Sequence, residues 1–254
     1  MITSKNNDIV KDLVSLKEKK FRDEKGEYLV EGFKMVKEAF ACNKRIVMLV
    51  GTENALEELG KTVDTGNVKT IAVSDGVLSH ISDCKTPQGV VCVLEEERFN
   101  AEKPEGASIL LDGVSDPGNM GTIIRTAAAV GVKDIYLINS CDPFSPKVVR
   151  SSMSGIYFVR MHFIGYDDLE RVFGGIELIA ADMHGENVFE YKPTRSFCVA
   201  VGNEANGLGV KTRNAATKIV SIPMTANAES LNVGVALSVV LYELVAGTSG
   251  KILG

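Results

Sequence analysis

Short apolar runs alternate with segments of helical periodicity from residue 107 onward, and this alternation restricts the possible folds more than any other feature. Such alternation is typical of a doubly wound α/β fold, in which helices cover both faces of a mostly parallel sheet. The expected strands are 108–111, 134–138, 157–163, 177–181, 197–201 and 218–222. The expected helices are 120–130, 145–154, 169–173 and 229–245.

A smaller α/β unit precedes this part of the chain, over residues 1–96. Apolar spacing predicts helices at 8–20, 36–40 and 55–59, and β-branched runs predict strands at 46–50, 70–73 and 89–94. Residues 97–106 are polar, lack periodicity and end in proline and glycine signals. Because such composition is typical of an interdomain linker, we expect a domain at 1–96, a linker at 97–106 and a second domain at 107–254.

Composition and charge exclude some classes of protein. No apolar run is long enough to span a bilayer and the N-terminus has no apolar signal core, so we expect a cytoplasmic protein. The net charge of −5 does not by itself suggest a nucleic-acid partner. Basic residues nevertheless gather at 17–25, where a solvated helix end is the plainer interpretation and contact with RNA phosphates is the alternative.

The cysteines and histidines do not form a metal-binding pattern. The five cysteines are far apart and none forms a C-x-x-C pair, which argues against a disulfide framework and a zinc site. His184 and Glu186 form an H-x-E triplet, but no C-x-x-C follows to complete a deaminase-like site. We therefore expect no metal.

Three loops that follow predicted strands carry polar residues, and ligands of doubly wound sheets bind beyond the carboxyl ends of strands. The first loop leads from Asp112 into a helix, in which Asn119 is a candidate cap and Arg125 lies among small and apolar residues. A guanidinium in that setting needs an anionic partner. The second loop, 202–209, places three glycines around Glu204, as expected where backbone approaches a ligand closely. The third loop, 222–232, contains Ser230 and Asn232, for which simple helix capping is the alternative role.

Together the three loops resemble the motifs of the SpoU/TrmH-type branch of the SPOUT superfamily of RNA methyltransferases, in the expected order. The stretch 112–125 resembles the first motif, 202–209 the second and 222–232 the third. Residues 20–33 and 85–90 resemble the small RNA 2′-O-ribose methyltransferase substrate-binding domain that often precedes the catalytic domain. The resemblance covers nearly the whole chain.

This resemblance implies a SPOUT-type doubly wound domain with a C-terminal trefoil knot, preceded by a small α/β RNA-binding domain. It also implies a homodimer packed through the knot region, with S-adenosylmethionine as the cofactor. By motif position, Gly202, Ile222 and Leu231 are expected in the cofactor pocket. The functional polar positions of the family fall on Asn119, Arg125, Glu204, Ser230 and Asn232, and the expected RNA contacts are Lys17, Lys20, Arg22 and Arg150.

The implied reaction is methylation of a ribose 2′-hydroxyl. This hydroxyl barely ionises at neutral pH, so it must be aligned and made more nucleophilic. A base role is assigned to the arginine in this family, but a guanidinium keeps its proton in proteins. The hypothesis from the residue types is that Arg125 grips a phosphate of the target and stabilises developing alkoxide character, while Glu204 orients Arg125. Asn119, Ser230 and Asn232 are expected to fix the pocket.

Several functions remain as alternatives. Ribosomal RNA is the expected substrate and transfer RNA the alternative, and a base-directed methyltransferase of the same superfamily is disfavoured by Ser230-Leu231-Asn232. A non-catalytic RNA-binding assembly factor that kept the fold is a rival from another class. A nicotinamide-dependent oxidoreductase is disfavoured because the chain has no G-x-G-x-x-G after its strands.

Overall fold

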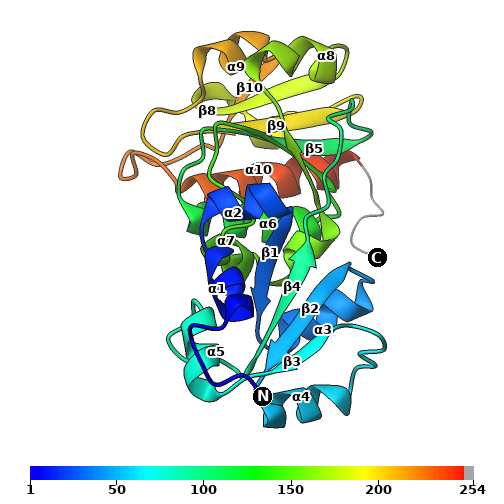
Figure 1. Ribbon diagram of the computed structural model, residues 1–254. Coiled ribbons are helices and arrows are strands. Elements are labelled where there is room, and N and C mark those ends of the chain that lie inside the picture. Colours follow the sequence, from blue (N-terminus) through cyan, green and yellow to red (C-terminus); the bar gives the residue numbers. More distant parts are fainter. Residues whose placement is uncertain (249–254) are drawn as a thin grey trace. The chain divides into compact units, whose positions relative to one another are not determined.

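The computed structural model describes residues 1–248, which form two compact units (Figure 1). The first unit comprises Met1–Glu97 together with Phe144–Tyr157, and the second comprises Arg98–Pro143 and the chain from Phe158 onward. The units differ from the predicted division of the chain because 144–157 belongs to the first of them. In this segment the Tyr157 hydroxyl donates to the Met35 carbonyl (3.1 Å), and the Phe144 ring packs against Tyr28 with 5.0 Å between centroids.

The first unit is built on a four-stranded sheet in the order β1-β4-β2-β3. Strand β4 is antiparallel to β1 and β2, whereas β2 and β3 are parallel. The strands are β1 Glu27–Glu31, β2 Ile46–Gly51, β3 Thr70–Ala72 and β4 Val90–Glu95. The helices are α1 Asp8–Ser15, α2 Lys19–Lys25, α3 Phe33–Ala41, α4 Glu53–Gly60, α5 Asp75–Ile81 and α7 Pro146–Ser151, the last followed by the 3₁₀ helix η1 Met153–Phe158.

The prediction of one helix at 8–20 was wrong, because the structure has two helices there. The apolar residues that pack into the core end at Leu16, and Glu18 is extended (φ −96°, ψ 134°), so the chain turns between α1 and α2. Strand β1 and helix α5 were not predicted. Both are short, and β1 is buried at each of its three central residues, so it shows no alternation that would mark it as a strand.

The second unit contains a six-stranded sheet in the order β10-β8-β9-β5-β6-β7, in which every neighbouring pair is parallel. This confirms the predicted α/β domain with a parallel sheet. The strands are β5 Ala107–Asp112, β6 Asp134–Ile138, β7 Arg160–Phe163, β8 Glu177–Asn187, β9 Phe197–Gly202 and β10 Lys218–Ser221. The helices are α6 Pro117–Ala129, α8 Leu169–Phe173, α9 Val210–Ala215 and α10 Val233–Thr248, with 3₁₀ helices η2 Tyr166–Asp168 and η3 Val188–Glu190.

The chain reverses its direction across this sheet between its two central strands. From β5 it proceeds outward through β6 to β7, and it then returns on the other side through β8, β9 and β10. Helix α10 packs against α6, and the Thr126 and Ser238 hydroxyls lie 2.8 Å apart between the two helices. In sheets of this kind, ligands bind beyond the carboxyl ends of the strands. Within residues 1–248, no helix has the length and apolarity needed to cross a membrane.

Candidate active site

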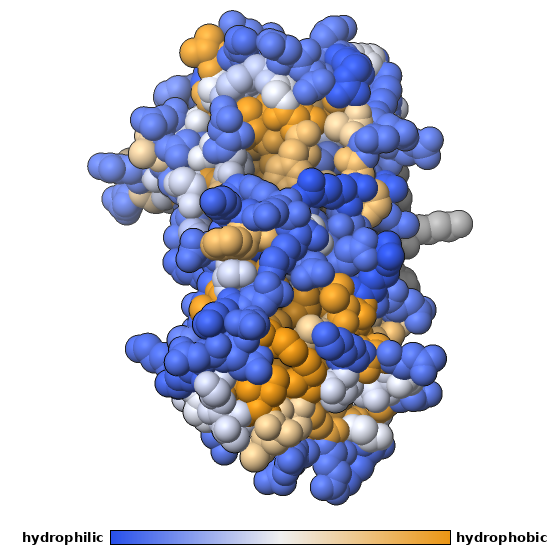
Figure 2. All heavy atoms as spheres, viewed as in Figure 1, coloured by the Kyte–Doolittle hydropathy of each residue, from blue (hydrophilic) through white to orange (hydrophobic). Residues whose placement is uncertain are grey.

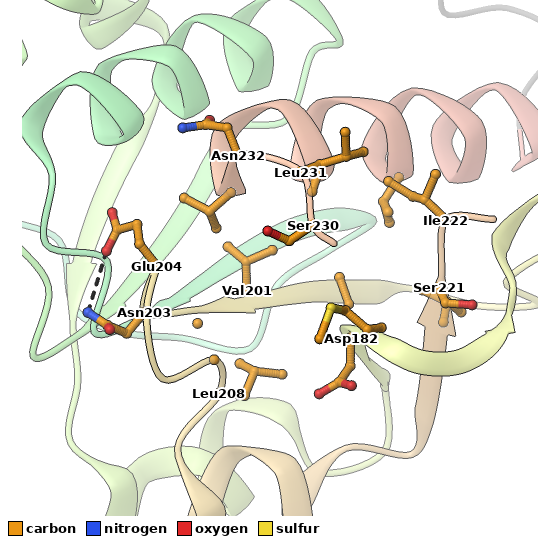
Figure 3. Close-up of a pocket in the computed structure, with 18 of the residues that line it drawn as sticks. Asp182, Val201, Asn203, Glu204, Leu208, Ser221, Ile222, Ser230, Leu231 and Asn232 are labelled. Carbon is orange, nitrogen blue, oxygen red and sulfur yellow. Dashed lines mark hydrogen bonds between the residues drawn. The ribbon is translucent and has the colours of Figure 1, made fainter. Parts of the chain in front are cut away.

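A cavity of about 460 Å³ lies at the carboxyl ends of β8, β9 and β10 (Figure 3). This volume falls within the range of about 300–1,000 Å³ that is usual for small-molecule sites. The structure brings Gly202, Ile222 and Leu231 into its lining, as predicted for cofactor-binding residues, together with Glu204, Ser230 and Asn232. Apolar side chains of Val201 and Leu208 also face this space in Figure 3.

The loop after β9 folds back on itself so tightly that only glycine fits at its start. Asn203 and Gly207 exchange two backbone hydrogen bonds of 2.9 Å each. A Cβ atom at Gly202 would lie 2.1 Å from the carbonyl carbon of Gly207 and 2.2 Å from the nitrogen of Leu208. Backbone atoms rather than a side chain therefore form this part of the cavity wall, as the glycine pattern predicted.

Three of the predicted polar residues form one hydrogen-bonded chain. Asn119 Nδ2 donates to Glu204 Oε1 (2.9 Å), and Asn119 Oδ1 accepts from Asn232 Nδ2 (2.8 Å). Asn232 Oδ1 in turn accepts from the backbone N–H of Gly234 (3.0 Å) in the first turn of α10. Because each amide donates at one end and accepts at the other, the chain fixes the orientation of both asparagines. We call Glu204, Asn119 and Asn232 the polar relay.

Glu204 is held by donors from the loop before α6. Its Oε2 accepts from the backbone N–H (3.2 Å) and the hydroxyl (2.8 Å) of Ser115, and its Oε1 accepts from the backbone N–H of Asp116 (3.1 Å). Burial raises the pKa of Glu204, but the hydrogen bonds from Asn119, backbone groups and Ser115 outweigh it and lower the pKa to about 2. Glu204 is therefore ionised at neutral pH, and it ties the loop after β9 to the start of α6.

The expected bond between Glu204 and Arg125 is absent. Arg125 lies on the exposed face of α6, and its guanidinium has no hydrogen bond or ion pair with any residue of the described chain. The apolar neighbours of Arg125 in the sequence, such as Ile123 and Ile124, point into the core instead of surrounding it. Arg125 thus does not need an internal anion, and it is free to meet one from outside.

The helix-capping alternatives have different outcomes at the three loops. Asn119 does not cap α6: Asp116 does, accepting from the backbone N–H of Asn119 (2.9 Å), and Asn119 itself is only 9% exposed. Asn232 caps α10 and also belongs to the polar relay, so both interpretations hold for it. Ser230 lies at the cavity, and its hydroxyl has no hydrogen-bond partner within the part of the chain that the structure describes.

The predicted RNA contacts in the first unit are not equally available. Arg22 is 3% exposed and donates to the Leu16 carbonyl (2.7 Å), so it closes the turn between α1 and α2 and does not face solvent. Lys17 donates to the carbonyls of His80 and Ser82 at the end of α5, and Arg150 pairs with Asp83 (2.9 Å). Lys20 is exposed and forms no ion pair within residues 1–248.

One wall of the cavity was not predicted from the sequence. Strand β8 extends six residues beyond the predicted end at 181, and its residues Asp182 and Met183 line the cavity. Asp182 accepts from the backbone N–H of His184 (3.1 Å) and pairs with Arg213. A carboxylate at the carboxyl end of a predicted strand was the available signal, but it stands alone and not in a glycine-rich or asparagine-rich loop.

Comparisons with known proteins match both parts of the chain. A model of the SpoU rRNA Methylase family matches residues 106–242, and a model of the MRM3-like substrate binding domain matches residues 7–92. The chain is 30% identical to a 23S rRNA (guanosine(2553)-2′-O)-methyltransferase, RlmP, of Bacillus subtilis, over 96% of this chain and 98% of that protein.

Solved structures are similar over the same extent. The crystal structure of an AdoMet-bound rRNA methyltransferase from Sinorhizobium meliloti has a TM-score of 0.86 and 31% identity, covering 95% of each chain. The SpoU methyltransferase AviRb from Streptomyces viridochromogenes, in complex with AdoMet, has a TM-score of 0.85 and 28% identity, covering 98% of this chain and all of that one.

Proposed function

This chain belongs to the SpoU rRNA methylase family, and on that premise we propose that it transfers a methyl group from S-adenosylmethionine to a ribose 2′-hydroxyl of ribosomal RNA. The observation that carries the proposal is the polar relay beside a cavity of suitable size. The helix that supplies Asn119 also carries Arg125, which has no ion pair within residues 1–248. The similarity to a 23S rRNA 2′-O-methyltransferase supports ribose and ribosomal RNA over a base or transfer RNA.

The residues around the cavity fit the cofactor. Its wall combines backbone at Gly202 and Gly207, where no side chain intervenes, with apolar groups of Ile222, Leu231 and Leu208. Such a wall suits an adenosine moiety, and the carboxyl groups of Asp182 and Glu204 at the same cavity suit a cationic ligand. When bound there, S-adenosylmethionine supplies an electrophilic methyl group.

The chain's own residues then position and activate the ribose hydroxyl. Arg125 grips a phosphate of the target nucleotide and stabilises negative charge that develops on the attacking oxygen. The polar relay holds Asn232 and the start of α10 in place, so that the neighbouring Ser230 hydroxyl is presented at the cavity. This assignment replaces the expected contact of Glu204 with Arg125 by a role for Glu204 in fixing the two loops.

The proposal includes a trefoil knot in the C-terminal part and a homodimer packed through that region. Helix α10 supports the dimer, because its residues Val235 (47% exposed) and Tyr242 (43% exposed) lie two turns apart on one face. An exposed apolar face on an otherwise buried helix is typical of an interface with another chain. The knot rests on the resemblance to the SPOUT family and on the path from the edge strand β10 back to α10, which packs against central strand β9.

In the first unit, the proposed RNA contacts shift toward lysines that have no acidic partner in the described chain. Lys34 at the start of α3 and Lys85 in the loop after α5 join Lys20, and all three are exposed. The Gln88 side chain accepts from the backbone N–H of Phe33 (3.1 Å), which brings the Lys85 loop next to the Lys34 turn. Phosphate contacts of this kind supply affinity without sequence specificity.

The test is transfer of labelled methyl from S-adenosylmethionine to unmodified ribosomal RNA, transfer RNA and ribosomal particles, followed by digestion to nucleosides. We expect a 2′-O-methylated nucleoside from the ribosomal samples and its loss with Arg125→Ala. Arg195→Ala is the matched control, because Arg195 is also an exposed arginine of the second unit but precedes the amino end of β9, whereas the three loops follow the carboxyl ends of strands. Label in transfer RNA alone would mean that the substrate is transfer RNA and not ribosomal RNA. No transfer to any sample, with cofactor binding intact, would favour the non-catalytic RNA-binding protein.

A further inference from the structure

The end of β5 and the loops after β7 and β9 meet at one buried carboxylate of the second unit, that of Asp112. Asp112 is the last residue of β5 and is 3% exposed. Its Oδ1 accepts from the hydroxyl of Tyr166 (2.8 Å), which follows β7, and its Oδ2 accepts from the backbone N–H of Gly209 (2.9 Å), in the loop after β9. Asp112 is not part of the cavity wall.

The approach of Gly209 to this carboxylate is as close as the backbone allows. A Cβ atom at Gly209 would lie 2.8 Å from both Asp112 Oδ2 and the Tyr166 hydroxyl oxygen. Both acceptor atoms of the carboxylate are thus used, one by a side chain and one by the loop backbone. Because a buried carboxylate needs such donors, the position of Gly209 is coupled to that of Tyr166 through Asp112.

The loop after β9 is therefore anchored at both of its ends. At its start, Asn203 Nδ2 donates to the Gly113 carbonyl (2.9 Å) and Glu204 binds the loop before α6. At its end, Gly209 binds Asp112. Between the anchors, Gly207 and Leu208 line the cavity, and they immediately precede Gly209.

We propose that Asp112 and Tyr166 are positioning residues for the cofactor: they hold Gly209 so that Gly207 and Leu208 form the cofactor-binding wall. We call Asp112, Tyr166 and Gly209 the Asp112 latch. The inference rests on the proposed function, since it assigns the cavity to S-adenosylmethionine. Under this inference, cofactor affinity depends on Asp112 and Tyr166, although neither residue lines the cavity.

The latch and the polar relay have separable effects. Glu204 keeps its own donors when the latch is broken, because Ser115, Asp116 and Asn119 do not involve Gly209. Loss of the latch therefore weakens cofactor binding and leaves the rate at saturating cofactor within about twofold of the wild-type rate. In kinetic terms, the KM for S-adenosylmethionine rises while kcat is retained.

The experiment compares Tyr166→Phe with Tyr191→Phe. Tyr191 also donates its hydroxyl to a glutamate, Glu177, but at the amino end of β8, away from the cavity. We expect Tyr166→Phe to raise the calorimetric Kd and the KM for S-adenosylmethionine about tenfold, as for loss of a hydrogen bond to a charged group. Tyr191→Phe should leave both constants unchanged, at a comparable melting temperature.

Asp112→Asn is the second variant, because its amide cannot accept from both Tyr166 and Gly209 in the present arrangement. It should raise the same two constants further, with kcat retained. An unchanged cofactor Kd in Tyr166→Phe would overturn the inference, as would an equal rise in Tyr191→Phe or a fall in kcat with KM constant. The proposed function fails by a different result, since wild-type protein would then not bind S-adenosylmethionine or not transfer its methyl group.

Discussion

Two sets of polar residues at the proposed active site differ in how fully their side chains are paired. Glu204, Asn119 and Asn232 satisfy one another and the backbone of the neighbouring loops. Arg125 and Ser230 have no partner within residues 1–248. Groups whose geometry is fixed by internal bonds lose no freedom when a ligand binds, whereas unpaired groups on the surface have bonding capacity left for that ligand.

We therefore regard Glu204, Asn119 and Asn232 as framework residues of the site, and Arg125 and Ser230 as substrate-facing residues. Framework residues should affect stability and turnover together, because their removal leaves partners unsatisfied. Substrate-facing residues should affect turnover with little change in stability.

Arg125 carries the largest expected effect. Arg125→Ala should lower kcat about a thousandfold, as expected for loss of a donor aimed at developing charge, with a melting temperature within about 1 °C of wild type. Arg125→Lys keeps the charge but not the planar donor fork, so RNA affinity should survive while most turnover is lost. Single-turnover methyl transfer and filter binding measure the two quantities. Full turnover in Arg125→Lys would mean that charge alone is needed.

Glu204 carries the next effect, and here stability should change as well. Glu204→Gln turns an acceptor of several N–H and O–H groups into a group that is half donor, so Asn119 loses its fixed orientation. We expect kcat to fall about a hundredfold and the midpoint of thermal unfolding to drop by several degrees. Glu190→Gln is the matched control, because Glu190 also accepts from an asparagine side chain but lies in η3. A stable but inactive Glu204→Gln would assign Glu204 to the substrate-facing set.

A smaller effect is expected on the free energy of unfolding, which should fall at low pH as Glu204 is protonated. The pKa of Glu204 is lowered to about 2 from its ordinary value of 4.5, so its contribution to folding is fully present above pH 4.5 and is lost as pH falls toward 2. After allowance for its solvent exposure, this contribution is about 1 kcal/mol. Denaturant unfolding of wild type and Glu204→Gln should therefore differ by this amount at pH 6 and converge as the pH falls to about 2. A constant difference across this range would contradict the assignment of its ionised form to the relay.

The strands of the second unit could be predicted from the sequence because the central strands β5, β6 and β9 are buried along nearly their whole length and read as continuous apolar runs. All six strands were placed, and the three motif loops lie where parallel strands end. The glycines of the loop 202–209 were expected to let backbone approach a ligand, and at Gly202 the structure shows a close approach to the backbone of Gly207 and Leu208. Features that depend on residues close together in the sequence, such as buried strands, could therefore be predicted from the sequence.

Side-chain partnership could not be read from the sequence. Glu204 accepts hydrogen bonds from residues that lie 85 to 89 positions earlier in the chain. The residues next to Glu204 in the sequence do not indicate whether its partner is Asn119 or Arg125. Arg22 lies in a basic run that suggests a solvated surface, yet it is buried because α1 and α2 are separate helices whose turn needs a donor at Leu16. Asp182 was missed since its strand continues past the apolar residues that mark it.

The lysines of the first unit can also be divided into internally paired residues and residues that are available to the substrate. Here we expect the smallest effects on RNA binding and stability. Lys20 is exposed and forms no ion pair within residues 1–248, whereas Lys17 donates to two carbonyls at the end of α5. Lys20→Ala should weaken RNA binding about threefold and lower the salt dependence of binding by about one ion, without changing the melting temperature. Lys17→Ala should instead lower the melting temperature by a few degrees and leave RNA binding unchanged, because it removes a cap from α5. Salt titrations of RNA binding and thermal melts on the same two variants measure both effects. If Lys17→Ala weakened RNA binding as much as Lys20→Ala, internal pairing would not be a guide to which residues meet the substrate.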